Sequence, residues 1–195
     1  MLFPMQPNPQ TSLPDLLDKG LSVLFVGINP SLYSVAQGHY FARKTNRFWP
    51  AFSRSVLSLA ARENLGLEAL EPMHDHLLPA QGFGFTDTVK RPTARASDVS
   101  PAEFAAAVTA LVEKIEYYRP RIACFHGTMA YRPVHRALTE TKTDPALGMQ
   151  TLSIGPTHLY VVPNPSPANA HFTPADQTAW YDRLAGTLLE LPSGP

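Results

Sequence analysis

The stretch LSVLFVGINPSLYS, residues 21–34, carries the strongest indication of the fold in this 195-residue chain. Its first half is an apolar run of strand length, and its second half is polar and contains a proline. A buried strand that leads directly into a polar loop is typical of an open α/β sheet, in which ligands bind beyond the carboxyl ends of the strands. We therefore expect residues 21–27 to form a central strand and residues 27–34 to face a binding site.

This polar loop has a counterpart near the other end of the chain. The apolar run LYVVP ends in Asn164-Pro165-Ser166, just as the first strand leads into Asn29-Pro30-Ser31. Proline fixes its own φ at about −65° and pushes the preceding residue towards extended geometry, so both asparagine amides project from stiff loops. We expect the two loops to face one another across a crevice, as a preorganised site requires.

Further strands and helices alternate along the rest of the chain. A Ser100-Pro101-Ala102-Glu103 capping box precedes apolar residues at helical spacing, and Thr173-Pro174 opens another amphipathic helix. The apolar pattern predicts strands over residues 121–127 and two strands within 151–166 joined at Gly155-Pro156. Remaining segments are predicted as helices over 12–20, 46–64 and 68–78, and as a long loop over 82–98. The fold class is therefore α/β, a three-layer α/β/α arrangement with a central, mostly parallel sheet.

Length and composition bound the function. The chain is expected to be a single domain spanning residues 1–195, with an extended arm over 1–10 and a short tail over 192–195. Sixteen basic and sixteen acidic residues cancel, so any site for a polyanion has to be a local patch. The single cysteine, Cys124, excludes an internal disulfide and an all-cysteine metal site. We find no run of eighteen apolar residues and no signal peptide, and we predict an intracellular, monomeric protein with no membrane contact.

An ordered set of motifs carries a resemblance to a known family. GINPSLYS, GHYF, NRFW, GFTDTVKRPTARASDVS and VVPNPS follow one another along the chain. With them the sequence resembles the mismatch-specific uracil/thymine DNA glycosylases, a branch of the uracil-DNA glycosylase superfamily, from about Val23 to Leu189. The resemblance implies a central parallel sheet and a repair enzyme that acts on double-stranded DNA containing uracil or mismatched bases. Such an enzyme flips the base and hydrolyses its N-glycosidic bond without metal or cofactor, leaving an abasic site.

The resemblance also assigns roles within the first polar loop and around it. Asn29 matches the residue that positions and polarises the attacking water, and Phe41 matches the aromatic that stacks on the flipped base. Ile28 lies where backbone groups meet the base edge, Ser34 lies beside the pocket, and Asn164 belongs to the base-binding set. An amide has no useful pKa near neutrality, so Asn29 acts by orientation and electrostatics rather than as a strong base. The alternative interpretations are an Asx turn for Asn29 and a core position for Phe41.

Asp87 departs from the family pattern. It lies in the GFTDTVKRPT segment, which the resemblance places near the site. A carboxylate there is able to activate water or to stabilise a cationic sugar, tasks that Asn29 performs poorly. A turn or cap residue is the alternative. The catalytic candidates are therefore Asn29 and Asp87.

The loop after the second Asn-Pro-Ser is a second departure. The family supplies a small flexible residue there, followed by a wedge and an arginine that probe the DNA, whereas this chain has Pro167, Ala168, Asn169 and Ala170 after Ser166. Pro167 lacks a backbone N–H, and Ala168 is too small to fill a vacated base position. Ser166 to Asn169 remain the predicted DNA-binding segment, with Asn169 or His171 as the candidate that replaces the arginine.

Basic residues near the predicted crevice are the candidate phosphate contacts. Lys90 and Arg91 are assigned to DNA binding, and Arg43, Lys44 and Arg47 cluster in the neighbouring segment. An ordinary solvated loop is the alternative. At the level of the whole protein, the competing hypothesis is a DNA-binding or nucleotide-sensing module of the same fold that has no catalytic activity.

Overall fold

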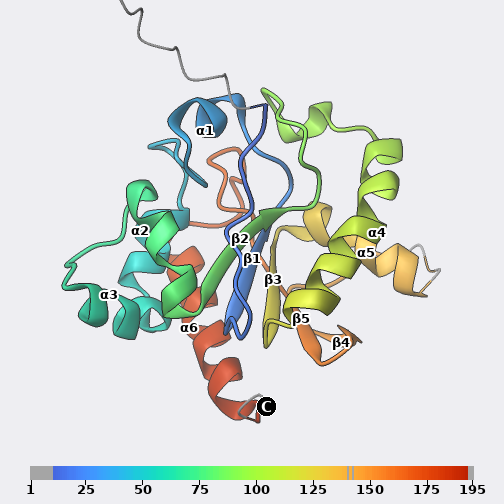
Figure 1. Cartoon of the computed structure of the whole chain (residues 1–195). Coiled ribbons are helices and arrows are strands. Elements are labelled where there is room, and N and C mark those ends of the chain that lie inside the picture. The colour runs from blue at the N-terminus through green and yellow to red at the C-terminus, as the bar shows by residue number, and fades with distance from the viewer. Residues whose placement is uncertain (1–10, 140, 142, 193–195) are drawn as a thin grey trace, which may run out of the picture.

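The central feature of the computed structural model is one mixed sheet (Figure 1). The structure describes residues 11–139, 141 and 143–192. Within them, five strands lie in the order β2-β1-β3-β5-β4. Strands β1, β2, β3 and β5 run parallel, and β4 pairs antiparallel with β5 at one edge. Their bounds are β1 Val23–Gly27, β2 Phe83–Asp87, β3 Ile122–His126, β4 Gly148–Ile154 and β5 Thr157–Val162.

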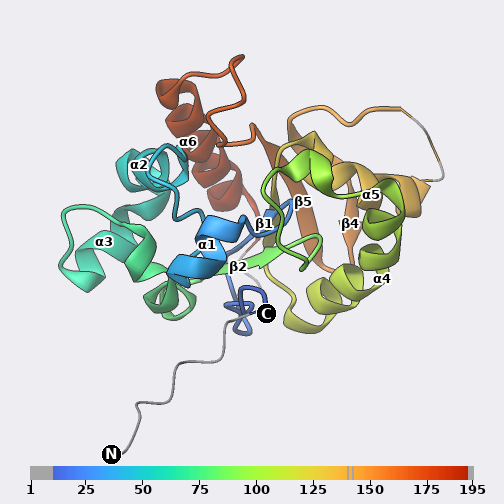
Figure 2. The same cartoon turned by 90° about the horizontal axis from the view of Figure 1, so that it is seen from above.

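Helices cover both faces of this sheet, as the α/β/α prediction requires (Figure 2). Alternate residues of β1 point to opposite faces: Phe25 packs with one apolar cluster and Leu24 with the other. The first face carries α2 (Phe48–Arg54), α3 (Leu59–Leu65) and α6 (Pro174–Glu190), and the second carries α4 (Pro101–Tyr118) and α5 (Thr128–Thr139). The short helix α1 (Leu32–Gln37) follows β1 directly.

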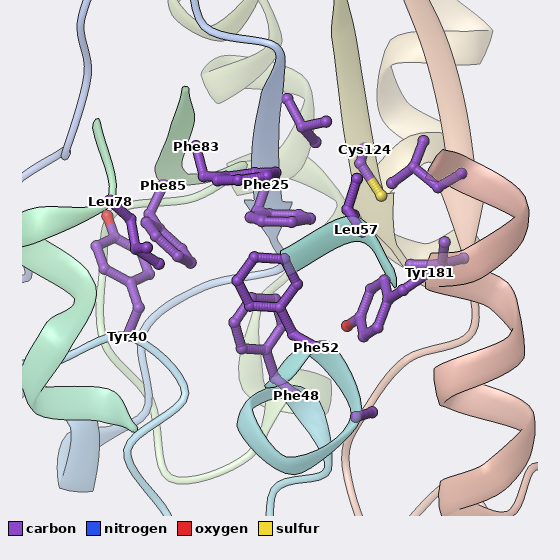
Figure 3. Close-up of a cluster of buried hydrophobic side chains, with 14 of the residues drawn as sticks. Phe25, Tyr40, Phe48, Phe52, Leu57, Leu78, Phe83, Phe85, Cys124 and Tyr181 are labelled. Atoms are coloured by element: carbon purple, nitrogen blue, oxygen red, sulfur yellow. The ribbon is translucent and has the colours of Figure 1, made fainter. Parts of the chain in front are cut away.

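Aromatic rings dominate the core on the α2/α6 face (Figure 3). Phe25 lies at the centre, with ring centroids 5.1 Å from Phe48 and 5.3 Å from Phe52, both edge-to-face. Tyr181 of α6 packs edge-on against Phe25 at 6.2 Å. Edge-to-face pairs add about 0.5–1.5 kcal/mol each beyond the burial of area, so this cluster locks α2 and α6 onto the sheet.

Local signals fixed the longest helices as predicted. Ser100 caps α4 through a reciprocal box with Glu103, and Thr173 caps α6 in the same way with Asp176. The two strands joined at Gly155-Pro156 and the strand at 121–127 are also confirmed, as β4, β5 and β3.

Other local predictions were wrong. The helix over 12–20 does not form, because Leu16 exchanges backbone hydrogen bonds with Phe85 on the free edge of β2. The loop over 82–98 begins as strand β2, and the helix over 68–78 is reduced to the 3₁₀ segment η2 (Pro72–Leu77). The helix over 46–64 is divided at Ser55 into α2, η1 (Val56–Ser58) and α3, and α5 was not predicted. Two short 3₁₀ segments complete the described chain, η3 (Pro79–Gln81) and η4 (Ala96–Asp98).

Two predictions concern the ends of the chain and membranes. The arm over 1–10 lies outside the described residues, as do residues 193–195 of the tail. None of the helices in the described part of the chain is long and apolar enough to cross a membrane.

Candidate active site

A cavity of about 720 Å³ lies at the carboxyl ends of the four parallel strands. Gly27 ends β1, Asp87 ends β2 and His126 ends β3, and all three line this cavity. Both Asn-Pro-Ser loops contribute to its wall, through Asn29 on one side and Asn164 on the other. The predicted crevice is thus confirmed, because parallel strands bring their carboxyl ends to one edge of the sheet.

Asn29 is held by the loop that follows β2. Its Nδ2 donates to the carbonyl of Arg91 at 2.9 Å and to Oγ1 of Thr93 at 2.8 Å. The backbone around it is tied to the same loop, since Thr93 N donates to the carbonyl of Pro30 at 3.1 Å. With Nδ2 occupied by these acceptors, Oδ1 is the atom of the amide that remains available to accept a hydrogen bond. The Asx-turn interpretation does not describe these long-range bonds.

Asp87 is a buried carboxyl group with an unusual environment. Only 4% of the residue is exposed, and its Oδ2 has no hydrogen-bond partner among the described residues. Burial raises the pKa of Asp87 to about 7; the Asp15 carboxylate adds to this rise, and the ammonium groups of Lys90 and Lys114 oppose it. A carboxyl group with this pKa exchanges a proton readily near neutral pH, which is the property of a general base.

Gly27 provides the space for that carboxyl group. It pairs with Asp87 in the β1–β2 register, and a Cβ at position 27 would lie 2.3 Å from Oδ1 of Asp87. Any side chain at this position would displace the carboxyl group, so the glycine is part of the geometry of the site. The sequence offered no signal for this beyond the glycine itself.

Phe41 forms a flat wall of the cavity. Its ring stacks on Phe48 with centroids 4.4 Å apart and planes at 18°, and His126 tilts against it at 5.1 Å. The Phe41 backbone has φ 52°, a left-handed conformation that costs on the order of 1 kcal/mol for a residue with a Cβ. Strain of this kind persists only where surrounding contacts hold it.

Hydrogen bonds of the residues on both sides of Phe41 stabilise its left-handed backbone conformation. The Tyr40 N–H donates to Asp75 at 2.9 Å, and the Tyr40 carbonyl accepts from the Trp49 indole at 2.8 Å. On the other side, the Ala42 N–H donates to Oγ of Ser34 at 3.3 Å. Ser34, predicted beside the pocket, lines it and also anchors the strained turn.

His126 and Tyr181 form a buried pair under the cavity that the sequence analysis missed. Nε2 of His126 lies 3.0 Å from the Tyr181 hydroxyl. Burial lowers the pKa of His126 to about 3, so the ring is neutral at pH 7. The only sequence signal was a histidine at the end of an apolar run. A neutral imidazole at this position stabilises the Phe41 and Phe48 rings without adding charge.

The loop after Asn164 is shaped mainly by short-range bonds. Oδ1 of Asn164 accepts from the Ser166 N–H at 2.9 Å, and Nδ2 of Asn169 donates to the Asn164 carbonyl at 3.1 Å. Pro167 and Ala168 are exposed at the rim of the cavity. All of the predicted segment from Ser166 to Asn169 lines the cavity.

Arg47 attaches this loop to the body of the protein. Its guanidinium donates to the carbonyls of Asn169 at 2.9 Å and Phe172 at 2.6 Å, and its N–H donates to Pro165 at 3.0 Å. Arg47 therefore positions the loop rather than presenting a free charge to a ligand.

Lys90 and Arg91, both predicted to bind DNA, have protein partners here. Nζ of Lys90 donates to Asp15 at 2.8 Å and to the Tyr40 hydroxyl at 3.2 Å, and the Arg91 guanidinium pairs with Glu103. Neither side chain lines the cavity. Ile28 does line it, and its carbonyl is engaged by the Val89 N–H at 2.9 Å. The residues that the structure describes contain no cluster of three or more His, Cys, Asp or Glu side chains that could hold a metal ion.

Comparison with known proteins identifies the family and the fold. The family model described as "Uracil DNA glycosylase superfamily" matches residues 14–185. A solution NMR structure from Methanosarcina acetivorans, of a protein described as a candidate uracil DNA glycosylase, superposes with a TM-score of 0.54. The two chains are 21% identical, and the match covers 90% of this chain and 98% of that one. At this identity the structural likeness shows the fold alone.

Proposed function

Because this chain belongs to the uracil DNA glycosylase superfamily, we propose that it flips uracil out of mismatched double-stranded DNA and hydrolyses its N-glycosidic bond. The observation that carries the proposal is the meeting of Asn29, Phe41 and Asp87 in one cavity at the strand ends. An aromatic wall, an amide acceptor and a carboxyl group of neutral pKa suit base binding, water orientation and proton removal in that order.

The proposed reaction separates binding from chemistry. The flipped base stacks on the free face of Phe41, with Ile28, Ser34 and Asn164 around it. Oδ1 of Asn29 orients a water molecule towards C1′ of the deoxyribose. As the bond from C1′ to the base nitrogen breaks, its electron pair leaves with the base and positive charge builds on the sugar. The water oxygen bonds to C1′, and its proton passes to Asp87.

Asp87 has a second effect in this scheme. Its ionised form places a negative charge beside the cationic sugar, so the same group stabilises the transition state before it accepts the proton. A pKa of about 7 keeps roughly half of the molecules in this form at neutral pH. This division of labour assigns orientation to Asn29 and charge to Asp87.

A monofunctional enzyme is the form that this scheme supports. Strand cleavage by a glycosylase through a Schiff base needs an amine nucleophile. Among the described residues that line the cavity there is no lysine. Water is then the nucleophile, the product is an intact strand with an abasic site, and the mechanism needs no metal.

The decisive experiment is incubation of excess protein with duplexes that contain U·G, U·A or T·G, with and without a chelator, followed by alkaline cleavage of abasic sites. We expect cleavage at uracil in the U·G duplex, unchanged by the chelator. Absence of abasic sites in every duplex would contradict the proposal and favour the non-catalytic DNA-binding module.

A further inference from the structure

A second cavity, of about 900 Å³, opens beside the first. The two cavities share Phe41, Arg43 and Asn46, so the segment that carries the base platform forms the ridge between them. The second one, which we call the lateral groove, is also lined by Tyr33 of α1, by α2 and by residues 68–73. Figure 2 shows α1, α2 and α3 on the same side of the sheet.

Cations without ion-pair partners gather in the wall of the lateral groove. Arg43, Lys44 and Arg54 line it, and all three are exposed. Within the described chain, none of these three forms an ion pair, whereas Lys90 and Arg91 near the first cavity are both paired. The carboxylates in the wall are Glu68 and Glu71, and Glu71 is engaged in capping η2. In a protein of zero formal net charge, free cations on one rim make a local anion-binding surface.

Exposed apolar surface lies beside these charges. The Tyr33 residue is 38% exposed and Met73 is 57% exposed, and both line the groove. The guanidinium of Arg43 lies 5.5 Å from the centre of the Tyr33 ring, so the cation is held next to a flat aromatic face. A nucleotide combines the two complementary properties, because its base has an apolar face and its phosphate is anionic.

We propose that the lateral groove binds the nucleotide adjacent to the flipped one on the same DNA strand. Arg43 and Lys44 contact its phosphate, and its unpaired base stacks on Tyr33. The proposal rests on the proposed function, because the shared ridge at Phe41 to Asn46 offers a strand whose nucleotide enters the first cavity a direct path into the groove. It also adds a preference within that substrate class: uracil with an unpaired neighbour, as in a bubble or a single strand, fills both cavities, whereas a U·G mismatch in an otherwise paired duplex fills the first cavity alone.

The test separates the groove from catalysis by using DNA without uracil. Affinity for a single-stranded 15-mer is measured by fluorescence anisotropy over a salt series for wild type and for Arg43→Ala/Lys44→Ala. The control, Lys19→Ala/Arg136→Ala, removes the same charge from exposed positions elsewhere. We expect about tenfold weaker binding by the groove variant and a salt slope smaller by about 0.7, because one neutralised phosphate is lost. Equal affinity and slope in both double variants would overturn the proposal.

Stacking is tested with a second probe, a strand of the same length that carries no bases. Wild type should bind the base-containing strand several-fold more tightly, and Tyr33→Ala should lose most of this preference, keeping only the part that stacking on Phe41 contributes. If Tyr33→Ala keeps the full preference for the base-containing strand, the neighbouring base does not stack on Tyr33. Because neither probe contains uracil, a wild-type protein that fails to excise uracil would refute the proposed function and leave the binding result intact.

Discussion

The two Asn-Pro-Ser loops begin with the same three residues and are stabilised in different ways. In the first, Nδ2 of Asn29 reaches Thr93 and the Arg91 carbonyl, more than sixty residues away. In the second, Oδ1 of Asn164 bonds the Ser166 N–H two residues on. One amide is oriented by the tertiary structure, and the other closes its own turn. Identical tripeptides at equivalent strand ends therefore need not do identical work.

The flanking contacts reinforce this difference. The first loop is paired to the chain around Thr93 on both sides, with Leu32 N donating to Thr93 O at 3.2 Å. The tip of the second loop, at Pro167 and Ala168, is exposed, and Arg47 is its main long-range anchor. A rigid first loop suits orientation of water, and a less anchored second loop suits contact with DNA of variable shape.

The largest effect on the excision rate should come from replacing Asn29 with alanine, compared with the same replacement of Asn164. Asn29→Ala removes the water acceptor and should slow single-turnover excision by at least about 10²-fold, because an oriented donor or acceptor at the reacting centre has this weight. Asn164→Ala, the matched change in the second loop, should cost less than about tenfold. Equal losses, measured in the U·G duplex with excess enzyme, would show that the loops share the chemistry.

Asp87 lies at the end of β2 in the wall of the same cavity. Replacing it should slow excision nearly as much as replacing Asn29. Asp87→Asn should slow excision by about 10²-fold at pH 8, and the wild-type rate should rise with pH through about 7, where the carboxyl group ionises. The variant should lack this rise. A pH profile unchanged by the substitution would return Asp87 to a structural role.

Asp87→Asn should also change the free energy of unfolding, in a direction that depends on pH. The folded pKa of about 7 lies above the unfolded value of 3.8, so the folded state holds the proton more tightly and wild-type stability falls as pH rises between these values. Asp87→Asn should therefore gain free energy of unfolding relative to wild type at pH 8, but not at pH 3. Urea denaturation at the two pH values measures the difference.

Gly27→Ala tests whether the close packing of Gly27 against Asp87 matters for stability and activity. The new Cβ would meet Oδ1 of Asp87, and overpacking of this kind costs about 1–3 kcal/mol. We expect a lower melting temperature and at least about tenfold slower excision. Gly186→Ala in α6, where a Cβ meets nothing within 4 Å, is the control and should preserve both. A Gly27→Ala protein with normal activity would mean that the Asp87 position is not critical.

Thr93→Val probes the long-range anchor alone. It removes one acceptor of Asn29 Nδ2 while the Arg91 carbonyl stays, so we expect about a fivefold to tenfold loss of excision rate. Ser166→Ala is the matched control, because it also removes one hydroxyl group, in this case from the second loop. It should change the excision rate less than twofold. The comparison of the loops fails if Ser166→Ala is the more damaging change.

The smallest effect is expected at the tip of the second loop. Ala168 is too small to fill the position that a flipped base leaves. Flipping therefore depends on how easily the base pair opens, and U·A should react more slowly than the weaker U·G pair. Ala168→Leu should raise the U·A rate about twofold to fivefold and leave U·G nearly unchanged. Equal wild-type rates on the two duplexes would show that another element drives extrusion.

Elements with strong local signals were predictable from the sequence alone. The apolar runs at 21–27 and 121–127 predicted buried strands, and the capping boxes at Ser100 and Thr173 predicted the α4 and α6 helices. The strand β2 was missed because FGFTD has two polar residues and a glycine, and its pairing with β1 is a long-range contact. The helix α5 was missed because Pro133 interrupts its pattern.

For the site, the resemblance to the glycosylase family singled out Asn29, Phe41 and the segment that carries Asp87, and the structure brings all three residues to one cavity. The chemical properties of these three residues depend on contacts that form only in the folded protein. The raised pKa of Asp87 comes from burial against Gly27, the direction of the Asn29 amide comes from Thr93, and the strained Phe41 turn is held by bonds to Ser34 and Asp75. Solvation and hydrogen bonding depend on which groups meet in space, and these groups are far apart along the chain.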